Sequence, residues 1–315
     1  MNTRRITREI PSIGQLRQHS SQVRSWGSGR PARTAFVLSG GGNQAVSQVG
    51  MLRALLERDL VPDVVVGCSA GAWNGSVVAA DPTLGAIDRL NDMWARLRGD
   101  VIFPGGRLSR AWNLLTRDDH LFSDEGLRAV IELGRTPASF EELAVPLRVV
   151  AADLDTGEEV VFACGRLRPA LLASAALPGL FPPVRFDGRV LVDGAVVDTV
   201  PLSHALAGPV DRVYVLNVSS ELMRRTHRSP LDVLVKAFAI SRKQRFELEL
   251  RSAPESVEVV VLPAPTDDRE LFDFSDPGRY VDEAYRLAVD ALDAADAARR
   301  RRGSLRRSWW RRTAG

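Results

Sequence analysis

Two short apolar runs, each followed by a glycine-rich turn and a helical pattern, constrain this fold most strongly. The first run, 34–39, passes through three consecutive glycines into a pattern with helical spacing. The second, 63–67, holds three valines in a row, as strands buried on both faces do, and turns at 67–71 into a helix expected to end near Ala80. This repeated order predicts an α/β fold with a parallel sheet and covering helices. The apolar stripe of the first helix consists of Val46, Val49, Leu52, Leu55 and Leu56.

The rest of the chain supplies further strands and helices. Strands are predicted at 146–153, 189–193, 213–218 and 257–262, and 158–163 is predicted to pair with the first of these as a hairpin across 155–157. Helices are expected within 84–145, at 230–250 and at 278–298. The packing residues expected in the first of these regions are Trp94, Leu97, Trp112, Leu115 and Leu127. We predict a single domain at 35–298, a basic flexible arm at 1–34, and an Arg/Trp-rich tail at 299–315.

The charge of the chain is unevenly distributed. Residues 1–34 carry +6 and residues 299–315 carry +8, so a net charge of +3 leaves about −11 on the segment between them. A core that binds nucleic acid needs a basic face to neutralise phosphates, and this acidic body argues against one.

The sequence also indicates where the protein works. No run approaches 18 apolar residues, and the first residues lack the apolar segment of a secretory signal, so a cytoplasmic protein is expected. Cys68 and Cys164 lie in apolar segments, which predicts two buried free thiols in a reducing compartment.

The segment Gly67-Cys68-Ser69-Ala70-Gly71 fits the G-x-S-x-G pattern of a nucleophile elbow. A sharp turn between strand and helix lifts the serine hydroxyl clear of the backbone, and the flanking Gly67 and Gly71 permit that turn. A helix beginning here also directs backbone N–H groups towards a developing anion. The alternative is an ordinary turn, which the placement between three valines and an apolar helix disfavours.

The glycine segment Gly40-Gly41-Gly42-Asn43 lies in the same position relative to the preceding strand. Its uncovered N–H groups suit an oxyanion hole, to which preorganised donors contribute several kcal/mol. Gly40, Gly42 and Ala45 also match a dinucleotide-binding fingerprint. That reading requires an acidic residue at the end of the second strand, where this chain has Gly67 and Ser69. No Gly-Lys-Ser/Thr follows, which excludes a P-loop.

A serine nucleophile needs a base, and Asp193-Gly194-Ala195 supplies a candidate at the end of the strand 189–193. A carboxylate there can point towards the loops at the sheet edge. The alternative is a turn aspartate, which would be favoured if the dipeptide stood alone.

These three motifs, in this order and spacing, resemble the patatin-like phospholipase family. The segments 173–183 and 201–205 are similar to it too, and the likeness covers about 36–207. It implies a three-layer α/β/α fold, a Ser69–Asp193 dyad without histidine, and an oxyanion hole at Gly40, Gly41, Gly42 and Asn43, supported by Gly67, Gly71, Gly194 and Ala195. It further implies hydrolysis of acyl esters of phospholipids or lysophospholipids, with no metal and no cofactor.

The chain departs from the family pattern after the glycines. The family usually continues with a basic residue and another glycine, where this chain has Gln44 and Ala45. The loss of a basic side chain weakens the case for a phospholipid preference more than the case for hydrolysis. Asn43 is either a side-chain donor to the oxyanion or a turn residue.

Two alternatives stay open. In a classical Ser-Asp-His esterase the histidine follows the other two residues, and His227, which comes after a predicted strand, is the candidate for that role. His19 lies in the arm, and His120 and His204, the latter on a predicted helix, are expected to be surface or packing residues. A non-catalytic protein that binds a nucleotide or a partner is the second. No histidine or cysteine spacing indicates a metal.

The tail combines eight arginines with Trp309 and Trp310. Such a segment suits an anionic membrane surface, with the indole rings at headgroup level, and would place the protein at the inner face of a membrane. A solvated tail, or one that contacts RNA or protein, is the alternative.

Overall fold

The computed structural model describes residues 32–97, 102, 120–219, 230–266 and 273–313. Two compact units are distinguished, Met1–Ala32 and Arg33–Gly315, and the second is described below. Most of the predicted arm, the predicted packing residues Trp112 and Leu115, and His227 lie outside the described residues.

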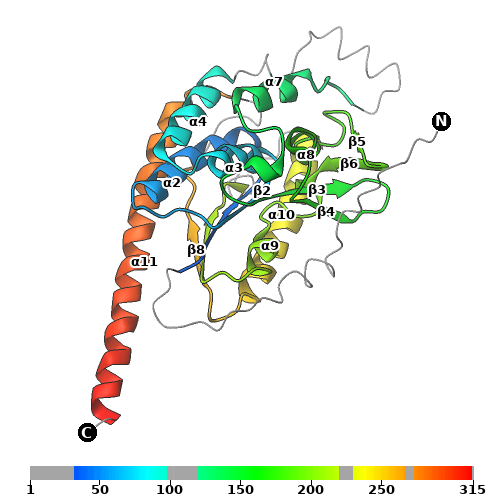
Figure 1. The fold of residues 1–315 in the computed structure, drawn as a ribbon. Helices are drawn as coiled ribbons and strands as arrows, with labels where there is room; N and C mark the ends of the chain where they lie inside the picture. Colours follow the sequence, from blue (N-terminus) through cyan, green and yellow to red (C-terminus); the bar gives the residue numbers. More distant parts are fainter. Residues whose placement is uncertain (1–31, 98–101, 103–119, 220–229, 267–272, 314–315) are drawn as a thin grey trace, which may run out of the picture. The chain divides into compact units, whose positions relative to one another are not determined.

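An eight-stranded sheet forms the centre of this unit (Figure 1), in the order β5-β6-β3-β2-β1-β7-β8, with β4 also paired to β3. The five strands from β3 to β8 along this order are parallel, while β4 and β6 pair antiparallel with β3, and β5 with β6. The sheet is therefore mixed and mostly parallel, as predicted. The strands are β1 (Thr34–Leu38), β2 (Val64–Cys68), β3 (Leu147–Asp153), β4 (Glu159–Phe162), β5 (Val184–Phe186), β6 (Arg189–Asp193), β7 (Arg212–Leu216) and β8 (Glu258–Leu262).

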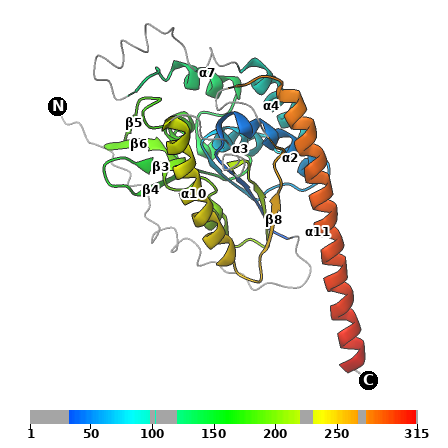
Figure 2. The ribbon, with the colours of Figure 1, turned by 180° about the vertical axis from the view of Figure 1, so that it is seen from behind.

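Helices cover both faces of the sheet, which gives the three layers (Figures 1 and 2). Phe36 and Leu38 of β1 pack with one set of helices, and Ala35 and Val37 pack with the other, because successive side chains of a strand point to opposite faces. The first set is α2 (Ser47–Leu56), α3 (Ala70–Ala80), α4 (Leu84–Arg96), α7 (Glu125–Leu133), α8 (Leu167–Ser174) and α11 (Pro277–Thr313); the second is α9 (Leu202–Leu206) and α10 (Pro230–Arg251). Short 3-10 helices are η1 (Gly42–Val46), η2 (Phe140–Glu142) and η3 (Gly194–Val196).

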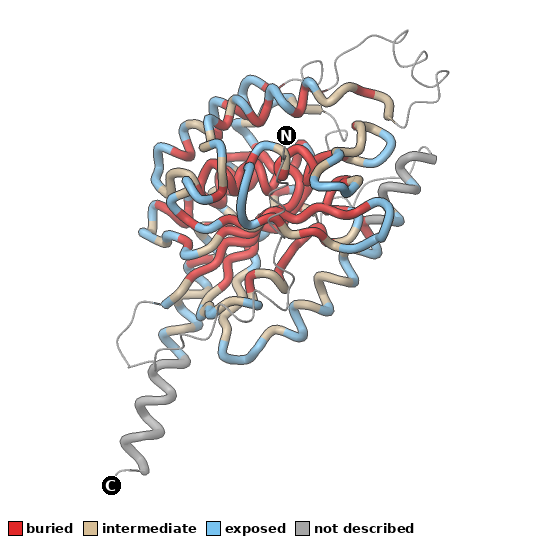
Figure 3. Tube along the Cα trace, turned by 45° about the vertical axis from the view of Figure 1, so that its right-hand side comes forward, coloured by how far each residue is buried: buried red, intermediate tan, exposed pale blue. Residues whose placement is uncertain are grey.

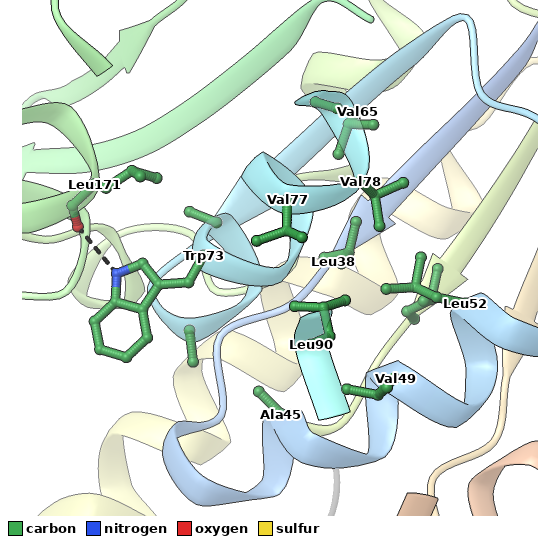
Figure 4. Close-up of a cluster of buried hydrophobic side chains, with 14 of the residues drawn as sticks. Leu38, Ala45, Val49, Leu52, Val65, Trp73, Val77, Val78, Leu90 and Leu171 are labelled. Carbon is green, nitrogen blue, oxygen red and sulfur yellow. Dashed lines mark hydrogen bonds between the residues drawn. The ribbon is translucent and has the colours of Figure 1, made fainter. Parts of the chain in front are cut away.

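The core lies between the sheet and the first set of helices. Figure 3 shows buried residues concentrated along the strands, and Figure 4 shows side chains of α2 and α3 meeting those of β1 and α4. The predicted stripe of α2 and the predicted packing residues Trp94, Leu97 and Leu127 are all buried. Each large side chain removed from water in this way contributes roughly 1.5–3 kcal/mol. Trp73 Nε1 also donates to Leu171 O at 3.4 Å, which joins α3 to α8.

Helix α11 lies directly against α2. A Cβ atom on Gly50 would be 2.0 Å from the carbonyl oxygen of Val281, so only glycine permits this approach. Tyr285 donates to Glu57 at 2.6 Å, and Arg58 pairs with Asp293 at 2.7 Å. Helix α11 therefore covers α2, although more than 200 residues separate the two in the sequence.

Three sequence predictions need correction. The last helix does not end near Ala298 but continues to Thr313, and Arg299 pairs with Glu258 at 2.9 Å. Cys164 is exposed, because it lies in the loop after β4, beyond the residues of that strand that face the core. Cys68 is buried, as predicted. Before α2, a 3-10 turn occupies 42–46 in place of a regular helix. None of the helices in the described part of the chain combines the length and apolar character that a membrane-spanning segment requires.

Candidate active site

The predicted turn between strand and helix is present at Ser69, between β2 and α3. Ser69 has φ 53° and ψ −129°, a conformation that costs a non-glycine residue on the order of 1–3 kcal/mol. Its neighbours allow α3 to begin against the ends of the strands: a Cβ atom on Gly67 would be 2.7 Å from Ala72 Cα, and one on Gly71 would be 2.4 Å from Ser39 O. The strain at Ser69 is therefore held by close backbone packing on both sides.

Asp193 is brought to this serine from β6, two strands away. Ser69 Oγ donates to Asp193 Oδ2 at 2.7 Å. The other carboxylate oxygen accepts from Ala195 N at 2.8 Å and from Cys68 Sγ at 3.9 Å. Gly194 lets the chain turn away beneath it, since a Cβ atom there would be 2.3 Å from Val150 O. Asp193 is thus a fixed acceptor for the serine hydroxyl.

The environment of Asp193 suits it to proton transfer. The carboxylate is completely buried and Ser69 is 8 % exposed. Burial raises the pKa of Asp193 from 3.8 to about 6, against the opposing hydrogen bonds from Ala195 and Ser69 and the charge of Arg242. A base is most effective when its pKa lies near the working pH, so this carboxylate is ionised at neutral pH yet still able to take a proton.

The glycine loop lies beside Ser69. Gly40 packs against it, since a Cβ atom on Gly40 would be 3.2 Å from Ser69 Cβ. The Gly40 N–H donates to Thr199 O at 2.9 Å, so Gly40 acts here as an anchor and not as the oxyanion donor we expected. Gly42 has φ 57°. Within the described residues, the N–H groups of Gly41 and Gly42 have no protein acceptor, which leaves them as the candidate donors.

Asn43 and Gln44 are directed elsewhere. Asn43 Nδ2 donates to Asp273 O at 2.8 Å, so one hydrogen of its amide holds a distant segment, and its role as a donor to the oxyanion stays a prediction. Gln44 is 3 % exposed, and its Oε1 has no partner among the described residues. A buried oxygen left in this state costs roughly 1–3 kcal/mol. The position that is basic in the family is therefore neutral and buried here.

Sequence reasoning missed a buried amide network beneath the loop. Gln48 Nε2 donates to Ser39 O at 2.8 Å and to Leu216 O at 3.1 Å. Asn74 Nδ2 donates to Gln48 Oε1 at 2.9 Å, and Trp94 Nε1 donates to Asn74 Oδ1 at 3.0 Å. A signal in the sequence is Asn74 itself, an amide within the mostly apolar stretch 70–80.

Ser174 is a second supporting residue that sequence reasoning missed. Its Oγ accepts from Ser69 N at 2.8 Å and donates to Val150 O at 2.6 Å, so it fixes the backbone of the elbow. It lies in the family-like segment 173–183, but that likeness gave it no role.

His204 pairs with a carboxylate outside the proposed dyad. Its Nε2 lies 2.5 Å from Glu159 Oε1, while the backbone of His120 forms an isolated β-bridge with Gly179. Glu159, Asp198 and His204 each place a ligand atom within 4.8 Å of the others, a spacing that suits a metal. However, the guanidinium of Arg245 already bonds to Glu159 and Asp198, at 2.9 Å each, so these side chains form an ionic cluster.

The architecture and this elbow define an α/β protein of the serine-hydrolase type. The family model for patatin-like phospholipases matches residues 36–206, more than half of the chain, and the protein belongs to this family. The match ends before α10, so that helix and α11 lie outside it.

Similar proteins include an uncharacterised NTE family protein of Mycobacterium tuberculosis, 33 % identical over 58 % of this chain and 47 % of its own length. Patatin-like phospholipase domain-containing protein 7 of Rattus norvegicus is 28 % identical over 59 % of this chain and 14 % of its own. Lysophospholipase NTE1 of Cryptococcus neoformans is 26 % identical over 59 % and 11 %. The chain spans less than half the length of these relatives.

Two solved structures are also similar to the chain. VipD of Legionella pneumophila aligns with a TM-score of 0.45 and 16 % identity, over 84 % of this chain and 67 % of its own. Human GIVD cytosolic phospholipase A2 aligns with a TM-score of 0.44 and 14 % identity, over 85 % and 58 %.

Proposed function

We propose that this protein hydrolyses acyl esters of phospholipids or lysophospholipids, with Ser69 as nucleophile and Asp193 as base. The observation that carries the proposal is the 2.7 Å hydrogen bond from Ser69 Oγ to a buried carboxylate at a strained elbow. An ordinary turn has no need of that strain, whereas in a nucleophile it lifts the hydroxyl clear of the backbone.

The geometry suits a two-step reaction. Ser69 Oγ attacks the acyl carbonyl carbon as its proton passes to Asp193 Oδ2, and the N–H groups of Gly41 and Gly42 bind the resulting oxyanion. Collapse breaks the bond to the alcohol oxygen, which leaves with the proton held by Asp193. Water then attacks the acyl-serine while Asp193 accepts its proton, and returning that proton to Ser69 Oγ releases the fatty acid.

The substrate class rests on the family and on relatives such as the one named lysophospholipase. Gln44 supports a broad preference among lipid esters, since a neutral buried amide offers no charge to a phosphate group. We therefore expect activity on lysophospholipid and on short neutral esters as well as on phospholipid.

Labelling with a fluorophosphonate tests the proposal, because only an activated serine reacts with it. Wild-type protein should gain one phosphonyl group on Ser69, and Ser69→Ala and Asp193→Asn should lose both labelling and ester hydrolysis. Ser76→Ala is the matched control, since Ser76 is buried in the helix that begins after Ser69 and, among the described residues, donates only to Trp73 O. An unlabelled wild-type protein would contradict the proposal.

The alternatives make different predictions. In a Ser-Asp-His esterase, His227→Ala would reduce turnover as much as Asp193→Asn does; we expect little loss from it. In a nucleotide-binding protein, calorimetry with NAD or FAD would show binding that Gly42→Val removes, and we expect no binding of either.

We also propose that the C-terminal tail holds the protein against the inner, anionic face of a membrane. The support is the +8 charge with two tryptophans in 299–315, beside a body that carries about −11. Changing Arg306, Arg307, Arg311 and Arg312 to Gln should abolish co-sedimentation with anionic vesicles in low salt while leaving hydrolysis of a soluble ester unchanged. Equal binding of both proteins to these vesicles would contradict the anchor.

A further inference from the structure

One short segment joins the two halves of the candidate site. Asp193 begins it, and Thr199 near its end accepts the Gly40 N–H through its carbonyl oxygen at 2.9 Å. Between them, the N–H groups of Val197 and Asp198 both donate to Gly194 O, at 3.0 and 2.8 Å. Any shift of residues 194–199 therefore moves the carboxylate and the glycine loop together.

Arg245 of α10 holds this segment from outside. Its Nη1 donates to Val197 O at 2.9 Å, and its Nη2 donates to Asp198 Oδ2 at 2.9 Å. The same guanidinium bonds to Glu159 of β4 at 2.9 Å and to Glu249 at 3.0 Å. Four acceptors on three parts of the chain fix its position. A planar guanidinium with several donors can satisfy such a set, whereas a single ammonium cannot.

Charge makes the contact necessary. The side chain of Asp198 is 3 % exposed, and its carboxylate lies with those of Glu159 and Glu249 around a single guanidinium. Burial raises the pKa of Asp198 to about 7, with Glu249 adding to the rise and Arg245 opposing it. Removing Arg245 would leave a buried carboxylate without the guanidinium that pairs with it, an arrangement that proteins relieve by movement or protonation.

We infer that Arg245 is a positioning residue for the candidate reaction, which acts on both the base and the oxyanion loop through Val197, Asp198 and Thr199. The inference rests on the proposed function. It assigns a role in the site to α10, which the family match at 36–206 does not include.

Kinetics on a soluble ester test this with Arg245→Met and Arg245→Lys. We expect Arg245→Met to lower kcat about 10- to 100-fold, with KM changed about twofold or less, because displacement of catalytic groups slows chemistry more than it weakens binding. Arg245→Lys should fall between Met and wild type. Arg251→Met is the matched control on the same helix, since Arg251 is 77 % exposed and pairs only with Glu247 among the described residues.

A double variant separates positioning from a general loss of stability. Arg245→Met with Asp198→Asn removes the unpaired buried charge, while the amide oxygen can still accept from Val200 N as Asp198 does at 3.1 Å. Its kcat should exceed that of Arg245→Met alone.

Three outcomes would overturn the inference: a folded Arg245→Met protein with wild-type kcat, a double variant no faster than the single one, or unchanged kcat in Arg245→Lys if the Met variant does not fold. Failure of the wild-type protein to label at Ser69 would instead overturn the proposed function, and the inference with it.

Discussion

The nucleophile elbow and the glycine loop are both glycine-rich turns between a strand and a helix, yet they are built differently. In the elbow, Gly67 and Gly71 are required because backbone atoms lie within 3 Å of where a Cβ atom would be. In the loop, the nearest neighbour of such an atom on Gly41 is the side chain of Val218, and on Gly40 it is Ser69 Cβ at 3.2 Å. Backbone packing shapes the elbow; side chains surround the loop.

The contacts that hold the two turns in place differ in the same way. The elbow continues directly into α3, so its N–H groups enter a regular helix. The loop enters a 3-10 turn and is fixed by hydrogen bonds from Gln48 and to Thr199, residues that neither strand nor helix geometry demands. The elbow should therefore tolerate almost no change, whereas changes at the loop should alter turnover while the fold survives.

Gly71→Ala should have the largest effect. Its methyl group would lie 2.4 and 2.5 Å from two backbone oxygens that cannot move aside, so we expect a loss of about 3 kcal/mol or more in the free energy of unfolding. Gly41→Ala is the paired test. Its methyl group would lie 2.6 Å from Val218 Cγ2, a side-chain atom that can shift where a backbone oxygen cannot, so we expect a smaller loss of about 1–2 kcal/mol together with slower turnover. Urea denaturation of both variants measures the contrast, and equal losses would remove the distinction between the turns.

Asp193→Asn should stabilise the protein as it inactivates it. The folded pKa of about 6 lies above the ordinary 3.8, so the ionised carboxylate destabilises the fold by up to about 3 kcal/mol once the pH exceeds 6, and by nothing below about 4. The gain in melting temperature should be largest near pH 8 and shrink towards pH 4. A gain independent of pH would show that the fold does not raise the pKa of Asp193.

Gln48→Met should affect the loop more than the elbow. It removes the Gln48 donor to Ser39 O and one of the two donors to Leu216 O, which still accepts from Ser39 N at 3.2 Å, and we expect a loss of about 2 kcal/mol. Because Ser39 precedes Gly40, we expect turnover to fall about tenfold as well. Asn91→Ala, an exposed polar change on α4, is the control. A stable Gln48→Met protein with full turnover would show that the loop does not depend on this network.

Cys68→Ser should have the smallest effect. The base must be ionised to act, so kcat/KM should rise with pH to a plateau, with its midpoint near the Asp193 pKa of about 6. A hydroxyl donates more strongly than the Cys68 thiol, which lies 3.9 Å from Asp193 Oδ1, and should move this midpoint down by about half a pH unit. Cys68→Ala should move it up. A midpoint that neither change moves would mean that another group controls the profile.

The sequence predicted what local geometry dictates. Strand, turn and helix around Ser69 were predicted because glycine spacing and runs of valine act over a few residues, and seven of the eight strands were predicted for the same reason. The short β5 was not, because Val184–Phe186 follows a proline-rich segment and pairs only with β6.

The supporting residues could not be found in this way. The acceptors of Gln48 lie 9 and 168 positions away, and Ser174 bonds to a residue 105 positions before it. A polar residue in a predicted helix could equally well lie on the solvent-exposed side until its hydrogen-bond partner is known. Cys164 shows the converse error: an apolar neighbourhood in sequence predicted burial, but the chain had already left the sheet.

The contact of Gly50 with Val281 also has a consequence for synthesis. Proteins emerge from the ribosome N-terminus first, so α2 appears more than 200 residues before the helix that covers it. Closing a contact over so long a stretch of chain is slow, because the loop entropy must be overcome before the contact stabilises anything. A nascent chain therefore carries its serine turn more than 200 residues before α11 can pack on α2, and Asn43 gains its acceptor at Asp273 only over the same stretch of synthesis.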